Sequence, residues 1–256
     1  MLTLFVNSRR QGMSKRTLEY YEYCLTPFVR SYGITSEGIN SFLTNLSCGN
    51  AKVNYYSAIK TFCNWLHKQG YIETNPITKV DRPLTSKRLL PAITEEQLEV
   101  LLSQTNSLRY KCILSLMFDS GLRVSEVCGI KPNGIDWSNN TLKVVVKGNR
   151  EAKAAFTART ATLLKDYLSS NGHNPTVFDI KPSGIQTTLK RLSKATGIPC
   201  NPHSFRRGFA CSLHRRGLST LDIMHLGRWK SLPMVERYTR SITFDDCLEH
   251  YKAVNG

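Results

Sequence analysis

The sequence lacks the features of a membrane or secreted protein. No apolar run approaches the roughly 20 residues that a membrane-spanning helix needs. The N-terminal segment MLTLFVNSRRQG has too short an apolar stretch before its arginine pair to resemble a signal peptide. We therefore expect a soluble cytoplasmic protein that has no membrane partner.

The eight cysteines lack the spacing of a zinc site or a disulfide framework. They lie at positions 24, 48, 63, 112, 128, 200, 211 and 247, with no Cys-x-x-Cys pair and no Cys/His ligand spacing. We interpret them as reduced thiols inside the fold. The sequence also has no Gly-x-Gly-x-x-Gly, phosphate-binding loop or His-Glu-x-x-His segment. We therefore expect no cofactor and no metal.

Acidic residues are scarce relative to basic ones. The 256 residues include 35 Lys and Arg but 19 Asp and Glu, which gives a formal net charge of +16. Such an excess suits a polyanionic partner, either nucleic acid or an anionic membrane surface. Because the features of a membrane protein are missing, nucleic acid is the favoured partner.

The first part of the chain is typical of a small helical domain. Ser14 is a suitable cap for a helix that runs to about Ser31, and apolar spacing predicts further helices around 39–46 and 50–70. We predict three or four helices in a domain over residues 1–80.

One predicted helix of this domain mixes basic, polar and aromatic side chains. Lys52, Asn54, Tyr55 and Lys60 lie among its apolar positions. Such a mixture suits phosphate contacts and base stacking, so we predict that these residues bind DNA. The alternative is an ordinary solvated helix face.

Prolines and irregular charges separate this domain from the rest. The segment NPITKVDRPLTSKRLLP holds three prolines and has no clear period, so we predict a linker over 81–93 and a second domain over 94–256. The second domain opens on Thr94-Glu95-Glu96-Gln97, which has the pattern of a capping box at the start of a helix.

The second domain reads as helical with one small sheet. LRYKCILSLMFDSG predicts a buried helix that ends at Gly121. IDW, TLKVVVKG and AKAAFT then alternate or run in β-branched residues between turn signals, which predicts three short antiparallel strands with Lys147 at the hairpin tip. Helices follow, and the end of the chain predicts a tail helix. The expected fold class is mainly α with a small antiparallel β-sheet.

The stretch from 203 to 238 gathers polar and aromatic residues on a series of short helices. His203 and Arg206 are three residues apart, which places them on the same face of a helix. Gly217 and Gly227 are suited to end successive helices, and Pro233 is suited to the first turn of another. This break between Trp229 and Tyr238 allows both rings to face one cleft.

Four motifs together resemble those of the tyrosine recombinase, or phage integrase, family. GLRVSE resembles its first-arginine motif, VKGNRE its hairpin lysine, and HSFRR its His-x-x-Arg motif. LGRW followed by YTR resembles its Leu-Gly-His segment and nucleophilic tyrosine. Taken singly, each residue also has an ordinary structural explanation, as an ion pair, a helix cap or a core side chain. The resemblance is close over residues 94–240, and before residue 80 it is one of position and size.

The resemblance implies a complete set of site residues. The catalytic residues would be Arg123, Lys147, His203, Arg206, Trp229 and Tyr238, and Glu126 would support them. Guanidinium groups suit a phosphate that gains charge, because they bind oxygen pairs and stay protonated. The phenol would be the nucleophile, the imidazole the base, and the hairpin ammonium the acid that protonates the leaving 5′ oxygen. Trp229 stands where most relatives have histidine, so it can donate a hydrogen bond but not shuttle a proton.

The resemblance also implies a reaction and its partners. We expect a site-specific recombinase of the compact Xer-like or mobile-element type, which cleaves and rejoins DNA through a 3′-phosphotyrosyl intermediate without metal or ATP. Its partner would be double-stranded DNA with a specific site, bound by a homotetramer that passes through a Holliday junction. The tail helix would dock on a neighbouring protomer or fold back on its own domain. The alternatives are a catalytically inactive sequence-specific DNA-binding protein and a strand relaxer like type IB topoisomerases.

Overall fold

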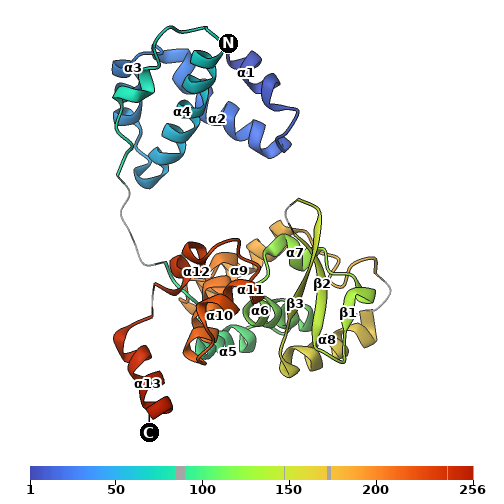
Figure 1. The fold of residues 1–256 in the computed structure, drawn as a ribbon. Coiled ribbons are helices and arrows are strands. Elements are labelled where there is room, and N and C mark those ends of the chain that lie inside the picture. Colours follow the sequence, from blue (N-terminus) through green and yellow to red (C-terminus); the bar gives the residue numbers. More distant parts are fainter. Residues whose placement is uncertain (85–89, 147, 172–173, 241, 256) are drawn as a thin grey trace. The chain divides into compact units, whose positions relative to one another are not determined.

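The chain forms two compact units, each with its own hydrophobic core. The computed structural model describes residues 1–84, 90–146, 148–171, 174–240 and 242–255. Unit 1 is Met1–Arg88 and unit 2 is Leu89–Gly256, and both are drawn in Figure 1. The boundary between the units falls inside the segment 81–93 in which a linker is predicted. Ile93, at the end of that segment, belongs to unit 2, because it is buried and its N–H donates to the Ser204 carbonyl.

Unit 1 is built of helices, and its described residues include no strand. Its elements are α1 (Leu2–Arg9), α2 (Lys15–Ser31), α3 (Ser36–Asn45) and α4 (Lys52–Lys68), with short 3₁₀ turns at Gly49–Ala51 and Pro76–Lys79. The Ser14 hydroxyl accepts a hydrogen bond from the Thr17 N–H, which confirms it as the cap of α2.

Helix α1 is not predicted from the sequence. Its apolar residues follow one another instead of repeating at helical spacing, so they give no amphipathic signal. Phe5 nevertheless lies in the core of unit 1, where its ring is 5.2 Å from the rings of Tyr21 and Phe62 and 5.5 Å from that of Trp65. Tertiary contacts between aromatic rings therefore stabilise this helix.

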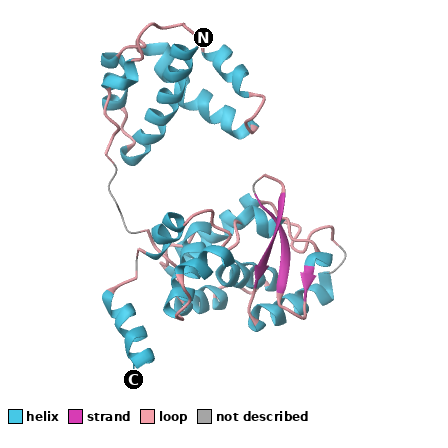
Figure 2. Ribbon diagram, in the orientation of Figure 1, coloured by secondary structure: helices cyan, strands magenta, loops and turns pink. Residues whose placement is uncertain are grey.

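Unit 2 combines helices with a three-stranded antiparallel sheet, as Figure 2 shows. The sheet is β1 (Ile135–Asp136), β2 (Thr141–Val146) and β3 (Arg150–Ala155), in that order. The helices are α5 (Glu95–Ser103), α6 (Leu108–Ser120), α7 (Val124–Cys128), α8 (Ala158–Asn171), α9 (Pro182–Thr196), α10 (Pro202–Arg215), α11 (Thr220–Leu226), α12 (Leu232–Thr239) and α13 (Phe244–Asn255), with a 3₁₀ turn at Pro132–Gly134. The predicted fold class is confirmed. No helix in the described ranges is long and apolar enough to span a membrane.

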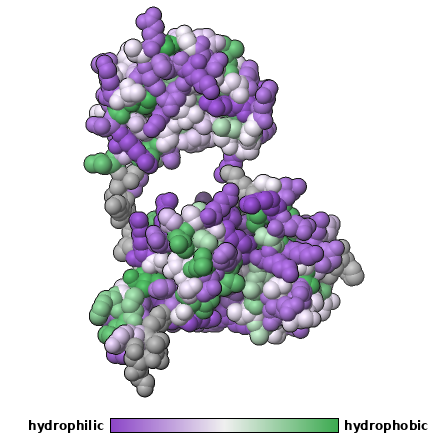
Figure 3. Space-filling model, in the orientation of Figure 1, coloured by the Kyte–Doolittle hydropathy of each residue, from purple (hydrophilic) through white to green (hydrophobic). Residues whose placement is uncertain are grey.

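Helix α6 is the central element of unit 2. Every residue from Cys112 to Phe118 is buried, which is typical of a helix that is covered on all sides. It packs against α10 and α8, and the sheet lies at one end of the unit (Figure 1). Polar residues cover most of the face drawn in Figure 3, with smaller apolar patches between them.

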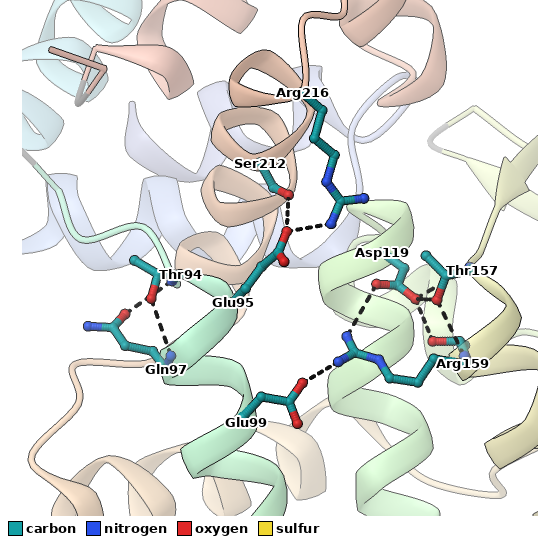
Figure 4. A network of polar contacts seen from close by, with 10 residues as sticks. Thr94, Glu95, Gln97, Glu99, Asp119, Thr157, Arg159, Ser212 and Arg216 are labelled. Atoms are coloured by element: carbon teal, nitrogen blue, oxygen red, sulfur yellow. Dashed lines mark hydrogen bonds and ion pairs between the residues drawn. The ribbon is translucent and has the colours of Figure 1, made fainter. Parts of the chain in front are cut away.

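Polar contacts fix α5 against α10 and α8 (Figure 4). Glu95 accepts hydrogen bonds from the Ser212 hydroxyl, at 2.9 Å, and from the Arg216 guanidinium. Glu99 pairs with Arg159, whose guanidinium also lies 3.8 Å from Asp119 of α6. The Thr94–Gln97 capping box is present as predicted. These contacts hold α10, which carries two of the predicted site residues.

The end of α6 comes unusually close to α10. Gly121 has φ +57, a left-handed conformation, and a Cβ built on it would lie 2.5 Å from the Phe209 ring of α10. Gly197 ends α9 with a similar φ of +72, but nothing lies within 4 Å of the position of its Cβ. Alanine substitutions at the two glycines therefore distinguish the cost of backbone strain from the cost of a steric clash.

We expect Gly197→Ala to lower the free energy of unfolding by about 1 kcal/mol, from backbone strain alone. Gly121→Ala is expected to cost about 3 kcal/mol, because the new methyl group also displaces Phe209. Urea unfolding of both variants beside the wild type measures the difference. Equal costs would show that the contact between α6 and α10 relaxes freely.

Candidate active site

The first predicted arginine lies where the chain turns from α6 into α7. Arg123 precedes α7, and its backbone N–H donates to Glu126 Oε2 at 2.9 Å. Its guanidinium donates to Glu126 Oε1 at 2.7 Å. The Glu126 side chain is 3% exposed and that of Arg123 is 40% exposed. A buried carboxylate thus holds a guanidinium whose other face is open to solvent.

The start of α10 is capped so that its first turn is fixed. The Asn201 side chain accepts hydrogen bonds from the N–H groups of His203 and Ser204, at 2.9 and 3.1 Å, and Pro202 occupies the first helical position. His203 is exposed at this end, and Arg206 lies one turn further on and is 2% exposed.

Arg206 is a buried cation that joins two distant parts of the chain. Its guanidinium donates to the Gly121 carbonyl after α6, and to the Gly227 carbonyl after α11 at 2.5 Å. Its Cζ also lies 4.3 Å from the centre of the Trp229 ring. Burial, followed by the positive charges of Arg123 and Arg228, lowers the pKa of Arg206 to about 10. The group therefore remains charged at neutral pH.

His203 lies in a positively charged environment. Partial burial lowers its pKa below the usual 6.5, and the guanidinium groups of Arg207, Arg206 and Arg123 lower it further. The imidazole is therefore largely neutral at neutral pH. In that state it can accept a proton.

Trp229 and Tyr238 meet across the break between α11 and α12. Trp229 is 5% exposed, and its ring centre is 5.2 Å from that of Tyr238, with the planes tilted by 42°. The Trp229 Nε1 is buried and has no hydrogen-bond partner among the described residues. Tyr238 is half-buried near the end of α12, where its carbonyl accepts a hydrogen bond from Cys211 of α10. The predicted restart of the helix thus brings both rings to one place.

The structure adds two arginines that the sequence analysis does not assign. Arg207 is buried, and its Nε donates to the Pro91 carbonyl at 2.7 Å. The Arg228 side chain is 9% exposed and lies 4.0 Å from Glu126 Oε2. Both residues stand inside motifs quoted for the family resemblance. The family roles were assigned to the neighbouring residues Arg206 and Trp229. No pattern in the sequence indicates that an arginine is buried.

Some predicted site residues lie elsewhere or outside the description. Lys147 falls between the described ranges, although the flanking strands β2 and β3 pair as predicted. In unit 1, the Lys52 ammonium donates to the Thr44 carbonyl. The Tyr55 ring packs edge-on against Phe42. Two further positions on α4, Asn54 and Lys60, are exposed.

The arrangement in unit 2 suits chemistry on an anion. Arg123, Arg206 and His203 influence one another electrostatically, and Tyr238 lies near enough to Arg206 to affect its pKa. An electron-rich oxygen and several fixed cations therefore lie together. Among the residues that the structure describes, no group of three or more His, Cys, Asp or Glu side chains is arranged to hold a metal ion.

Alignments with named relatives extend over nearly the whole chain. Tyrosine recombinase XerA of Saccharolobus solfataricus is 28% identical over 267 positions, which cover 96% of this chain and 89% of the relative. Tyrosine recombinase XerA of Pyrococcus horikoshii is 26% identical and covers 91% of this chain and 86% of its own.

Solved structures share the fold. A lambda integrase structure bound to DNA superposes with a TM-score of 0.79 at 16% identity, and covers 95% of this chain and 96% of its own. The XerH recombinase bound to its palindromic difH substrate gives a TM-score of 0.75 at 17% identity, over 99% of this chain and 83% of its own. The phage integrase family matches residues 91–243, more than half of the sequence. The resemblance seen in the motifs is thereby confirmed, and the chain belongs to the phage integrase family.

Proposed function

We propose that the protein is a site-specific tyrosine recombinase, which cleaves and rejoins DNA strands through a 3′-phosphotyrosyl intermediate. The observation that carries this function is the position of the Tyr238 ring against Trp229, whose ring the buried guanidinium of Arg206 also contacts. A phenol is a weak nucleophile by itself and needs a base to take its proton as it attacks. The names of the relatives, tyrosine recombinases XerA, XerC and XerD, support the same activity.

The proposed reaction exchanges one phosphodiester for another. The Tyr238 oxygen attacks the phosphorus while its proton passes to His203, and the bond from phosphorus to the 5′ oxygen breaks. Lys147 protonates the leaving 5′ oxygen. Arg123 and Arg206 neutralise the charge that grows on the non-bridging oxygens. Attack by a different 5′ hydroxyl reverses these steps and joins a new pair of strands.

Trp229 has a narrower role in this scheme. Its buried Nε1–H lacks a partner among the described residues and is suited to donate to a phosphate oxygen. An indole does not exchange protons near neutral pH, so acid–base transfer falls to His203 and Lys147. Glu126 holds Arg123 in place through two hydrogen bonds.

The proposed partner is duplex DNA that carries a specific recombination site. The net charge of +16 favours such a partner. We assign the 1–80 region to DNA clamping, with Lys52, Asn54, Tyr55 and Lys60 as its contacts, and the 94–256 region to catalysis. A lambda integrase has been solved as a tetramer bound to a Holliday junction. By analogy, four copies of this chain would assemble on two sites, in the cytoplasm where the DNA lies.

Tyr238→Phe is expected to abolish covalent attachment to DNA and to leave DNA binding unchanged, because it removes one oxygen from a half-buried ring. The substrate is a duplex with a target sequence selected from a random library by the wild-type protein. A nick placed 3′ of the cleavage point lets the released strand diffuse away. Denaturing gels reveal the covalent band, and labelling of the released strand reveals its free 5′ hydroxyl.

The same assay separates the alternatives. Specific binding by the wild type without a covalent band would identify an inactive DNA-binding protein. Relaxation of a supercoiled plasmid that lacks the selected sequence would identify a topoisomerase-like strand relaxer. A covalent band that persists in Tyr238→Phe would refute the assignment of the nucleophile.

The cleavage rate is expected to fall in acid with a midpoint below pH 6.5. Burial and the neighbouring guanidinium groups lower the pKa of His203, so the base stays neutral until the pH is lower than for an ordinary histidine. The dependence of kcat/KM on pH reports groups of the free enzyme. In His203→Gln this acid limb should disappear and the residual rate should be lower. An unchanged limb in that variant would assign the titration to another group.

A further inference from the structure

Arg228 holds a backbone conformation that suits glycine. Its φ is +56, in the left-handed region where a Cβ crowds the backbone and which residues other than glycine, asparagine and aspartate seldom adopt. Local strain of this kind persists when the surrounding contacts impose it. The contacts of the Arg228 side chain explain how the conformation is held.

The Arg228 guanidinium binds carbonyl groups from three elements. One terminal nitrogen donates to the Ser120 carbonyl of α6 at 2.9 Å. The other donates to the Leu226 carbonyl of α11 at 2.8 Å and, more weakly, to the Lys153 carbonyl of β3 at 3.4 Å. The side chain is 9% exposed, and its charge is balanced by Glu126 at 4.0 Å.

Arg206 binds the same two helix ends one residue further along. It donates to the carbonyls of Gly121 and Gly227, which directly follow the carbonyls of Ser120 and Leu226 that Arg228 binds. The last carbonyls of a helix lack partners within it and carry the negative end of its dipole. Two cations therefore join the C-terminal ends of α6 and α11.

These helix ends lead directly into the proposed site. The chain runs from Gly121 through Leu122 to Arg123, and from Gly227 through Arg228 to Trp229. A change in the spacing between the two ends would move the first arginine relative to the indole and to the Tyr238 ring that packs against it. The second cation thus fixes a distance on which the reaction depends.

We propose that Arg228 is a positioning residue for strand cleavage, which acts by holding the ends of α6 and α11 together beside Arg206. The inference rests on the proposed function. Arg228 acts through Arg206, Arg123 and Trp229. Its effect depends on the fixed directions of its two terminal N–H donors as well as on its charge. Lysine at this position keeps the charge but cannot donate along two fixed directions.

Arg228→Gly tests this role, because it removes the guanidinium and also relieves the backbone. The single-turnover rate of covalent complex formation on the nicked duplex, at saturating full-length protein, is expected to fall about 100-fold, as for a misplaced reacting group. The dissociation constant for the same duplex is expected to stay at the wild-type value, and the rates are compared at a temperature at which the variant is fully folded. Arg228→Lys is expected to be nearly as slow as Arg228→Gly.

Asn140→Gly is the matched control. It relieves a similar left-handed conformation, φ +49, in the turn between β1 and β2, and it is expected to cleave at the wild-type rate. A wild-type rate in Arg228→Gly or Arg228→Lys would overturn the positioning role. A rate that returns to the wild-type value when cooling restores the folded protein would also overturn it, because the loss would then come from unfolding. Failure of the wild type to form any covalent complex would instead overturn the proposed function.

Discussion

The buried guanidinium of Arg206 is the contact on which the site depends. It bridges the carbonyls that follow α6 and α11, and it lies against the Trp229 ring. A buried charge is costly unless its hydrogen bonds are satisfied, and these carbonyls satisfy it at the negative ends of two helices. The same hydrogen bonds fix the positions of the two segments that lead to Arg123 and to Trp229. One interaction thereby supports the fold and places the cations around the proposed phosphate position.

Positive charges outnumber negative ones around this contact. Glu126 is buried between Arg123 and Arg228 and neutralises part of their charge. Burial, and after it repulsion from Arg123, lower the pKa values of Arg206 and Arg228, so like charges face one another in the free protein. A phosphodiester bound in the proposed site would relieve this repulsion. The charge proposed to stabilise bound DNA would thus slightly destabilise the free protein, a usual cost of a preorganised site.

The segment from Trp229 to Tyr238 brings two rings together because a helix is interrupted there. A continuous helix would turn residues nine positions apart to opposite faces. Gly227 ends α11 closely enough that a Cβ on it would lie 1.8 Å from the Trp229 ring, and α12 restarts with Pro233 in its first turn. The Trp229 ring therefore folds back over Gly227 to reach Arg206, and Tyr238 approaches it from the next helix.

Local patterns in the sequence determined the helices of both units other than α1, the three strands, the Thr94 capping box and the family motifs. They did so because periodicity, caps and turn residues act over a few neighbouring positions. Helix α1 escaped prediction because aromatic contacts with α2 and α4, and not its own pattern, stabilise it. The burial of Arg206, the second cation at Arg228 and the closeness of Trp229 to Tyr238 were decided by the tertiary structure alone. Each requires carbonyls or rings from segments distant in the chain, and a local pattern carries no information about such partners.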